Sequence, residues 1–199
     1  MIRPEWTDDD LVNQTRGGEK LIQLLNESDV AWIIVHGHKH VADLFYGHGG
    51  ANAPVIFACA SFSAQVNLDA QNKSPNQVHY LVCDPEGARA AGLTSAGTVS
   101  SWTWQPGLGW GRSQGLHGLR HLVGFGYRAS VNSLVDDLEQ ELDAQGASQL
   151  PWTSAVHVLP ALERLVPVDF VAFERVLNDR GLVILTEQDG SLAQIGRRT

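Results

Sequence analysis

Basic residues are scarce in this chain, and long hydrophobic runs are missing. Of its 199 residues, 14 are lysine or arginine and 22 are aspartate or glutamate, which gives a formal net charge of −8. A broad nucleic-acid-binding face needs clustered basic side chains, so nucleic-acid binding is not indicated. No apolar stretch approaches the roughly 18–20 residues that a membrane-spanning helix requires, so we expect no membrane partner.

Cysteine is almost absent as well. Cys59 and Cys83 are the only two, and each lies within an apolar run. Two such residues are typical of buried thiols in a cytoplasmic protein rather than of the disulfide framework of a small secreted domain. The acidic N-terminus, with Asp8 to Asp10, also lacks the basic segment that begins a secretion signal. We therefore expect a cytoplasmic location.

The common phosphate-loop and nucleophile patterns are missing too. The 20 glycines form no GxxxxGK[ST] loop and no strand-linked GxGxxG. Ser61 and Ser63 have no context that would make either of them a nucleophile. The sequence therefore gives none of the usual signs of a nucleotide-binding enzyme or of an enzyme with a serine nucleophile.

Hydrophobic residues make up 43% of the chain and charged residues 18%, which is enough apolar material for a core. Apolar periodicity predicts helices over residues 7–28, 131–144, 156–165 and 170–177. It also predicts a buried strand over 30–35 and three strands over 54–62, 78–83 and 97–104 that neighbour one another in one sheet. The end of the chain predicts a hairpin that turns at Asp189-Gly190. The fold class is therefore α/β (α+β), and helices followed by a terminal hairpin are typical of a winged-helix outline.

The sharpest chemical signal is the run from Ile33 to His40, in which an apolar segment ends in Gly-His-x-His. Imidazole is a common ligand of divalent first-row metals. Side chains at i and i+2 of an extended chain point to the same side, so His38 and His40 are suited to hold one ion or two neighbouring ions. We therefore predict a metal-binding loop at the end of a strand.

Other families that use this spacing fit less well. A cupin requires a glutamate shortly after the histidines, where this chain has Val-Ala-Asp43, and a metallo-β-lactamase requires an aspartate where this chain has His40. The chain is too short for the barrel of an amidohydrolase. His117 and His121 would share one face of a helix, but Gly115 and Gly118 disfavour a helix there.

The segment from residue 15 to residue 110 resembles the C-terminal part of the calcineurin-like metallophosphoesterases, with Gly37-His-Lys-His40 as its sharp motif. The resemblance implies a partial αββα sandwich over residues 1–112, followed by a mostly helical tail domain with its hairpin over 113–199. It implies phosphoric ester hydrolysis with Mn, Fe or Zn. His38 and His40 would then each bind one of two metal ions. His36 has no ligand role in the family's pattern, and its weaker candidate role is to hydrogen-bond a ligand.

The family's earlier ligand motifs are missing. The chain contains no D-x-H, no G-D and no G-N-H, and only a short stretch precedes the histidines. Three explanations stay open: a split or truncated enzyme completed by another chain, a degenerate relative kept as a binding or regulatory module, or an unusual site that recruits His48, His79 or Asp43. In the first case an N-terminal half would cover the open sheet, and a homodimer is the other possible cover. Trp102, Trp104 and Trp110 are expected to pack on a sheet rather than to form a ligand platform.

Overall fold

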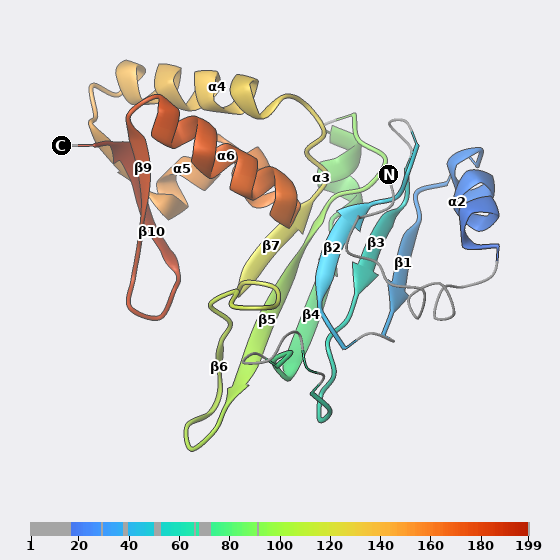
Figure 1. Ribbon diagram of the computed structural model, residues 1–199. Coiled ribbons are helices and arrows are strands. Elements are labelled where there is room, and N and C mark those ends of the chain that lie inside the picture. Colours follow the sequence, from blue (N-terminus) through green and yellow to red (C-terminus); the bar gives the residue numbers. More distant parts are fainter. Residues whose placement is uncertain are drawn as a thin grey trace.

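The computed structural model describes residues 17–28, 30–37, 40–49, 53–65, 67, 73–90 and 92–198. It is a mixed α/β structure, as the sequence predicts, and Figure 1 shows its elements. Within the described residues, no helix is both long and apolar enough to cross a membrane. The elements, in chain order, are α2 (Gly18–Asn26), β1 (Ile33–His36), β2 (Asp43–Tyr46), β3 (Val55–Ala58), β4 (Gln77–Cys83), α3 (Pro85–Ala90), β5 (Gly97–Gln105), β6 (Gly109–Arg112), β7 (Leu122–Phe125), α4 (Val131–Ala144), β8 (Gln149–Pro151), α5 (Trp152–Val158), the 3-10 helix η1 (Pro160–Glu163), α6 (Pro167–Asp179), β9 (Leu182–Thr186) and β10 (Leu192–Arg197).

Strands β1 to β7 form two sheets, which we call the sheet unit. One sheet has the order β1-β3-β2, and the other has the order β4-β5-β6 with β7 also paired to β5. β3 alternates between buried and half-buried residues, which places Val55 and Phe57 in the interior. They share one core with Val99 of β5 and Phe125 of β7. The two sheets therefore face each other across a common hydrophobic layer.

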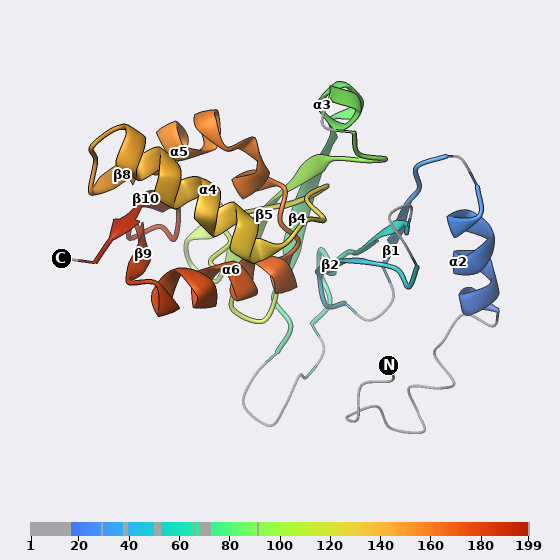
Figure 2. The same ribbon diagram turned by 90° about the horizontal axis from the view of Figure 1, so that it is seen from above.

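Residues 131–198 form a second layered structure, which we call the helix–hairpin unit. Its strands have the order β8-β10-β9, and its helices lie on the opposite side of the molecule from α2 (Figure 2). The Ser130 side chain accepts a hydrogen bond from the Asn132 N–H and caps α4. Leu134, Leu138 and Leu142 recur at four-residue steps and are buried in this unit's own core. The predicted helix over 131–144 and the predicted hairpin turn at Asp189-Gly190 are both confirmed.

The two units are joined by backbone hydrogen bonds. The Gly124 N–H donates to the Leu165 carbonyl oxygen at 3.1 Å, and the Tyr127 N–H donates to the Arg164 carbonyl oxygen at 3.0 Å. The Arg164 guanidinium also lies 3.0 Å from the Asp84 carboxylate. β7 lies beyond residue 112 and yet pairs with β5. The division into domains at residue 112 stays a prediction.

Several expectations about the strands are wrong. The strand predicted over 54–62 is β3, and it lies in a different sheet from β4 and β5. The strand predicted as buried over 30–35 begins only at Ile33, and Val30 and Val35 are 58% and 54% exposed. β1 pairs with β3 alone among the described strands, so one of its edges has no partner strand there. An apolar run predicts a strand, but its burial depends on neighbours that the run does not specify.

The helical expectations outside α4 also need correction. The helix predicted over 7–28 is α2, which spans residues 18–26, and residues 7–16 lie outside the described part. The helix predicted over 156–165 is instead α5 followed by η1, because Leu159 leaves the helical conformation before Pro160. The helix predicted over 170–177 begins earlier, at Pro167. The two cysteines are less buried than expected, since Cys59 is half-buried and Cys83 is exposed.

Candidate functional site

The loop that carries the histidine motif leaves one end of the sheet β1-β3-β2. β1 runs parallel to β3, and β2 runs antiparallel to it, so β1 and β3 end where β2 begins (Figure 1). His36 and Asp43 both pair with Ala58, one from each side. Their backbones are therefore about 10 Å apart, two strand spacings. The His36 imidazole and the Asp43 carboxylate therefore both belong to this edge of the sheet, where the histidine loop begins and ends.

Two further residues define this edge. The Cys59 N–H donates to the His36 carbonyl oxygen at 2.7 Å, and a Cβ added to Gly37 would lie 3.8 Å from the Cys59 Cβ. Burial raises the pKa of the Cys59 thiol. The sequence does not single out Cys59, because only the parallel pairing of β1 with β3 brings it next to the motif. The alternation of apolar and polar residues within one strand carries no information about which strands pair.

His40 has an unusual backbone. Its φ angle is +57°, in the left-handed region, and the only other described non-glycine residue with a positive φ is His117. Such a conformation costs roughly 1 kcal/mol or more and persists only where the surrounding structure enforces it. Within the described residues, strain of this kind therefore falls on a predicted metal ligand, His40, and on His117 in the loop before β7.

His38, the other predicted ligand, lies outside the described residues together with Lys39. Among the described residues, no three or more His, Cys, Asp and Glu side chains form a group that would hold a metal ion. His36 and His48 are exposed, and the His48 carbonyl oxygen accepts a hydrogen bond from the Asn26 side chain. The described residues thus supply donors of suitable chemistry at the strand ends, but they do not by themselves complete a metal site.

His79 links the two sheets from the interior. Its Nε2 accepts a hydrogen bond from the Ala60 N–H at 3.3 Å, so Nδ1 carries the proton and donates to the Ser101 Oγ at 2.9 Å. The edge of the imidazole ring also meets the ring of Phe57 at a centroid distance of 5.2 Å. Both ring nitrogens are occupied by protein groups, so His79 fits the structural role better than that of a metal ligand.

Burial lowers the pKa of His79 to about 4, against an ordinary value of 6.5. Between these two pH values His79 is protonated in the unfolded chain but neutral in the folded chain. The free energy of unfolding therefore falls as the pH decreases from about 6.5 towards 4. We expect His79→Gln to flatten this decrease in urea unfolding measured at pH 7.5, 6 and 5. His157→Gln, at an exposed position of α5, is the control and should keep the wild-type slope. An unchanged slope in His79→Gln would contradict the assignment.

The second histidine pair does not form a helical site. Residues 114–121 are a loop, and His117 is exposed with a φ of +59°. The Nδ1 of His121 lies 2.9 Å from the Ser101 carbonyl oxygen, and its ring meets the edge of Trp102. The glycines on either side of His117 prevent the helix that a shared face requires.

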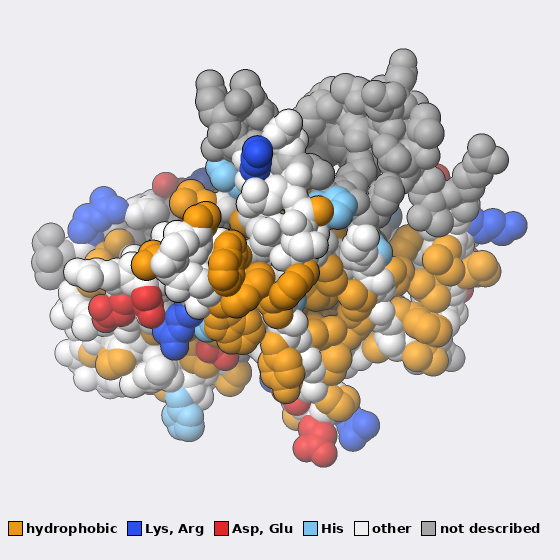
Figure 3. Space-filling model, turned by 90° about the horizontal axis from the view of Figure 1, so that it is seen from below, with side chains coloured by type: hydrophobic (Ala, Val, Ile, Leu, Met, Phe, Trp, Pro, Cys, Tyr) orange, Lys and Arg blue, Asp and Glu red, His pale blue; other side chains and the backbone are white. Residues whose placement is uncertain are grey.

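The outer face of the sheet β4-β5-β6 is apolar. Strand register places Val78 beside Trp102 and Trp104 beside Trp110 on this face. Trp104 meets Trp110 edge to face, and Phe62 stacks on Trp110 at 5.4 Å. Figure 3 shows a broad band of hydrophobic side chains on this side of the molecule. The tryptophans therefore pack on the sheet, and among the described residues Tyr80, Val82 and Trp104 on these strands are exposed.

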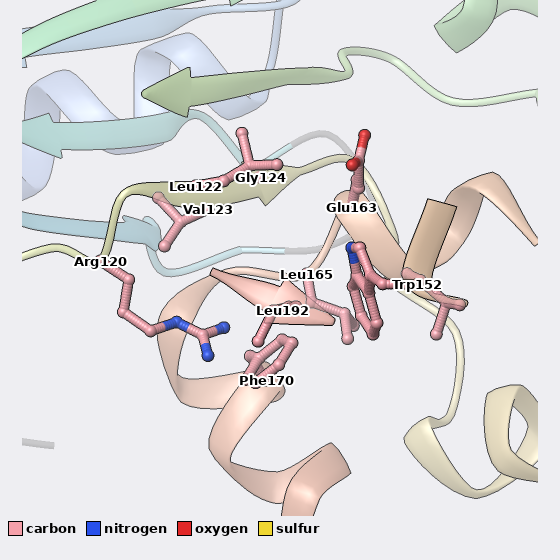
Figure 4. Close-up of a pocket in the computed structure, with 10 residues that line it drawn as sticks. Arg120, Leu122, Val123, Gly124, Trp152, Glu163, Leu165, Phe170 and Leu192 are labelled. Atoms are coloured by element: carbon pink, nitrogen blue, oxygen red, sulfur yellow. The ribbon is translucent and has the colours of Figure 1, made fainter. Parts of the chain in front are cut away.

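The seam between the two units centres on Arg120. Its guanidinium lies 3.5 Å from the centroid of the Phe170 ring (Figure 4). It also lies 3.8 Å from the Glu174 carboxylate. Burial lowers the pKa of Arg120, and burial also raises the pKa of Glu174. Small cavities on both sides of Arg120 are lined by residues of both units. The sequence gives no sign of this seam, because its members are far apart in the chain.

One comparison with known proteins finds a match. Residues 123–179, less than half of the chain, match the family model wHTH-Calcineurin_assc, a calcineurin-associated winged helix-turn-helix domain. The matched residues run from β7 to the end of α6. No curated protein and no solved structure matches the chain. The stretch from β7 through α6 is therefore similar to a calcineurin-associated winged helix-turn-helix domain, and the β9–β10 hairpin lies outside the matched residues.

Proposed function

We propose that the chain is the C-terminal part of a metal-dependent phosphoesterase, and that it contributes His38 and His40 to a site for divalent metal ions (Mn, Fe or Zn). The remaining ligands would come from another polypeptide. Metal ions at such a site hold and polarise a phosphate ester. The chain's own part is to fix the histidine loop at the ends of β1 and β3, with Asp43 and His36 beside it.

The strained backbone of His40 carries this proposal. A left-handed, non-glycine residue lies where three strand ends meet, and it coincides with a ligand of the Gly-His-x-His motif. Strained backbone of this kind is concentrated at functional sites. The similarity of the following unit to a calcineurin-associated winged helix supports the same assignment.

The surface of the sheet unit supports a missing partner. Leu21 and Leu24 of α2 and Trp32 just before β1 are 47%, 56% and 41% exposed, and one edge of β1 has no partner strand among the described residues. Exposed apolar surface beside an unpaired strand edge is a binding site for further chain. We propose that an N-terminal half of the enzyme covers this side, and a homodimer is the alternative cover.

The first test is metal binding by the chain as it exists. Titration with Mn²⁺, followed by calorimetry, should give weak binding that His38→Ala and His40→Ala each reduce by about tenfold or more. His157→Ala, on the distant helix α5, is the matched control and should bind Mn²⁺ like the wild type. Undiminished binding in both loop variants would contradict the proposed ligands.

The second test separates the proposed enzyme from a non-catalytic binding module. The chain is mixed with a candidate polypeptide that carries D-x-H, G-D and G-N-H, and turnover of an aryl phosphate ester is measured with Mn²⁺. The proposal expects activity only in the mixture and loss of that activity with His38→Ala. A stable complex without turnover would favour the binding module. A reduced Mn²⁺ affinity in His48→Ala would instead favour a site within this chain.

A cytoplasmic location stays a prediction. It is supported by Cys59 and Cys83, which are both free thiols in the structure. Free thiols are typical of reducing compartments.

A further inference from the structure

The outer face of the sheet β4-β5-β6 carries large apolar side chains that the described residues leave exposed, and we call it the tryptophan face. Tyr80 and Val82 of β4 lie on it together with the two tryptophans of the β5–β6 hairpin. Figure 3 shows the apolar band on this side of the molecule. The residues that are each more than one-third exposed include Phe62, Tyr80, Val82, Trp104, Leu108 and Trp110.

The tryptophan face is almost uncharged. Arg112 is the only lysine, arginine, aspartate or glutamate in the strands β4, β5 and β6, and its guanidinium is 2.9 Å from the Asp189 carboxylate. The chain as a whole carries a formal charge of −8. A face without carboxylates has no anchor for a basic peptide, and a face without free cations has none for phosphates. Aromatic side chains without charges are typical of the centre of a protein–protein interface.

The size of the face is close to what a stable dimer requires. A whole aromatic side chain presents roughly 150–250 Å², so the exposed fractions of the six residues named above present roughly 600–700 Å². Val78, which is 37% exposed, adds to this surface. An interface of standard size buries about 800 Å² on each partner, and monomers rarely expose apolar patches this large.

The face is also complementary to itself. Trp104 and Trp110 lie opposite each other at the hairpin end of the strands. At the other end Thr98 lies between Val82 of β4 and Gly124 of β7, so the side chains there are small. A two-fold dimer requires a surface that fits its own rotated copy. An axis that crosses the strands would place the tryptophans of each copy over the small residues of its partner.

We infer that the tryptophan face binds a second copy of this chain, and that the two β4-β5-β6 sheets pack face to face around a two-fold axis. The chain is thus a homodimer in which each β5–β6 hairpin reaches across the partner's sheet. Packed sheets of this kind lie about 10 Å apart with interdigitated side chains. This interface is separate from α2 and the edge of β1, where the N-terminal half is proposed to bind, and it does not depend on the metal site.

Sedimentation equilibrium of the full chain tests this inference. We expect a dimer with a dissociation constant in the micromolar range, the weak end for an interface of this area. Tyr80→Glu places a charge at the centre of the interface and should raise the dissociation constant by about a hundredfold or more. Leu108→Glu, at the hairpin tip, should raise it by about tenfold. Both residues are mostly exposed in the single chain, and circular dichroism checks that both variants are folded.

Leu24→Glu is the matched control, because Leu24 is an exposed apolar residue of α2 on the other proposed surface. Its dissociation constant should equal that of the wild type. Tryptophan emission should shift to shorter wavelengths as the wild-type concentration rises, since Trp104 and Trp110 become buried, and Tyr80→Glu should not show this shift. A wild type that stays monomeric at about 200 µM would overturn the inference, whatever else covers the face. So would a dimer that Leu24→Glu dissociates and Tyr80→Glu leaves intact.

Discussion

Replacing Gly124 with alanine is expected to lower the free energy of unfolding by about 3 kcal/mol or more, at the upper end of overpacking effects. A Cβ at this position would lie 1.7 Å from the Glu163 carbonyl oxygen and 2.9 Å from the Arg164 Cα. These are backbone atoms, which cannot rotate away as the end of a side chain does. The substitution must therefore push β7 away from residues 163–165 and stretch the hydrogen bond from Gly124 to Leu165. Urea unfolding measures the loss.

Gly111→Ala is the matched control for this prediction. Gly111 also lies on a strand of the same sheet, but its Cβ would meet only the end of the Gln105 side chain at 3.1 Å. We expect its unfolding free energy to change by well under 1 kcal/mol, since a flexible side chain can move. Equal effects of the two substitutions would show that the seam between the units is not rigid at this point.

Phe173→Ala is expected to destabilise the chain by about 3–5 kcal/mol, the usual cost of truncating a buried phenylalanine. Phe173 is 0% exposed, and it lies in the core of the helix–hairpin unit among Leu138, Leu177 and Ile195. A loss of this size is a large fraction of the roughly 5–15 kcal/mol that stabilises a typical domain. Thermal unfolding followed by circular dichroism should show a much lower midpoint.

Val171→Ala tests whether burial causes this effect. Val171 lies on the same helix, two residues before Phe173, and is 65% exposed. Its truncation should change the unfolding free energy by about 0.5 kcal/mol or less. A large effect at Val171 with a small one at Phe173 would mean that α6 packs in a different orientation.

The helix–hairpin unit could be predicted well from the sequence because its signals are local. Leu134, Leu138 and Leu142 mark one face of α4, and the Asp189-Gly190 pair marks the hairpin turn. These features depend on spacing within one element. The exact ends of α5 and α6 were harder to place, since they depend on Pro160 and Pro167 and on the loop that separates them.

The sheet unit was harder to predict because sheet membership is not a local property. β3 and β4 both resemble buried strands, and nothing within either run indicates that they lie in different sheets. β2 has only four residues and begins with Asp43, so its pattern is weak. From the sequence we could predict only in outline that one edge of the sheet holds Gly37, Asp43 and His36. The bonds of His79 to Ala60 and Ser101 could not, because they join residues about 20 positions apart.

The pairing of β7 with β5 has a consequence for how the chain folds during synthesis. Val123 and Phe125 of β7 fill the core between the two sheets. Nascent chains generally fold domain by domain from the N-terminus, but here the first core stays unfilled until the ribosome has released residue 125. By then the first turns of α4 follow closely behind. Val166, just before α6, belongs to the same core. Completion of the sheet unit should therefore wait for part of the helix–hairpin unit, and a pause in translation before β7 would leave an aggregation-prone intermediate.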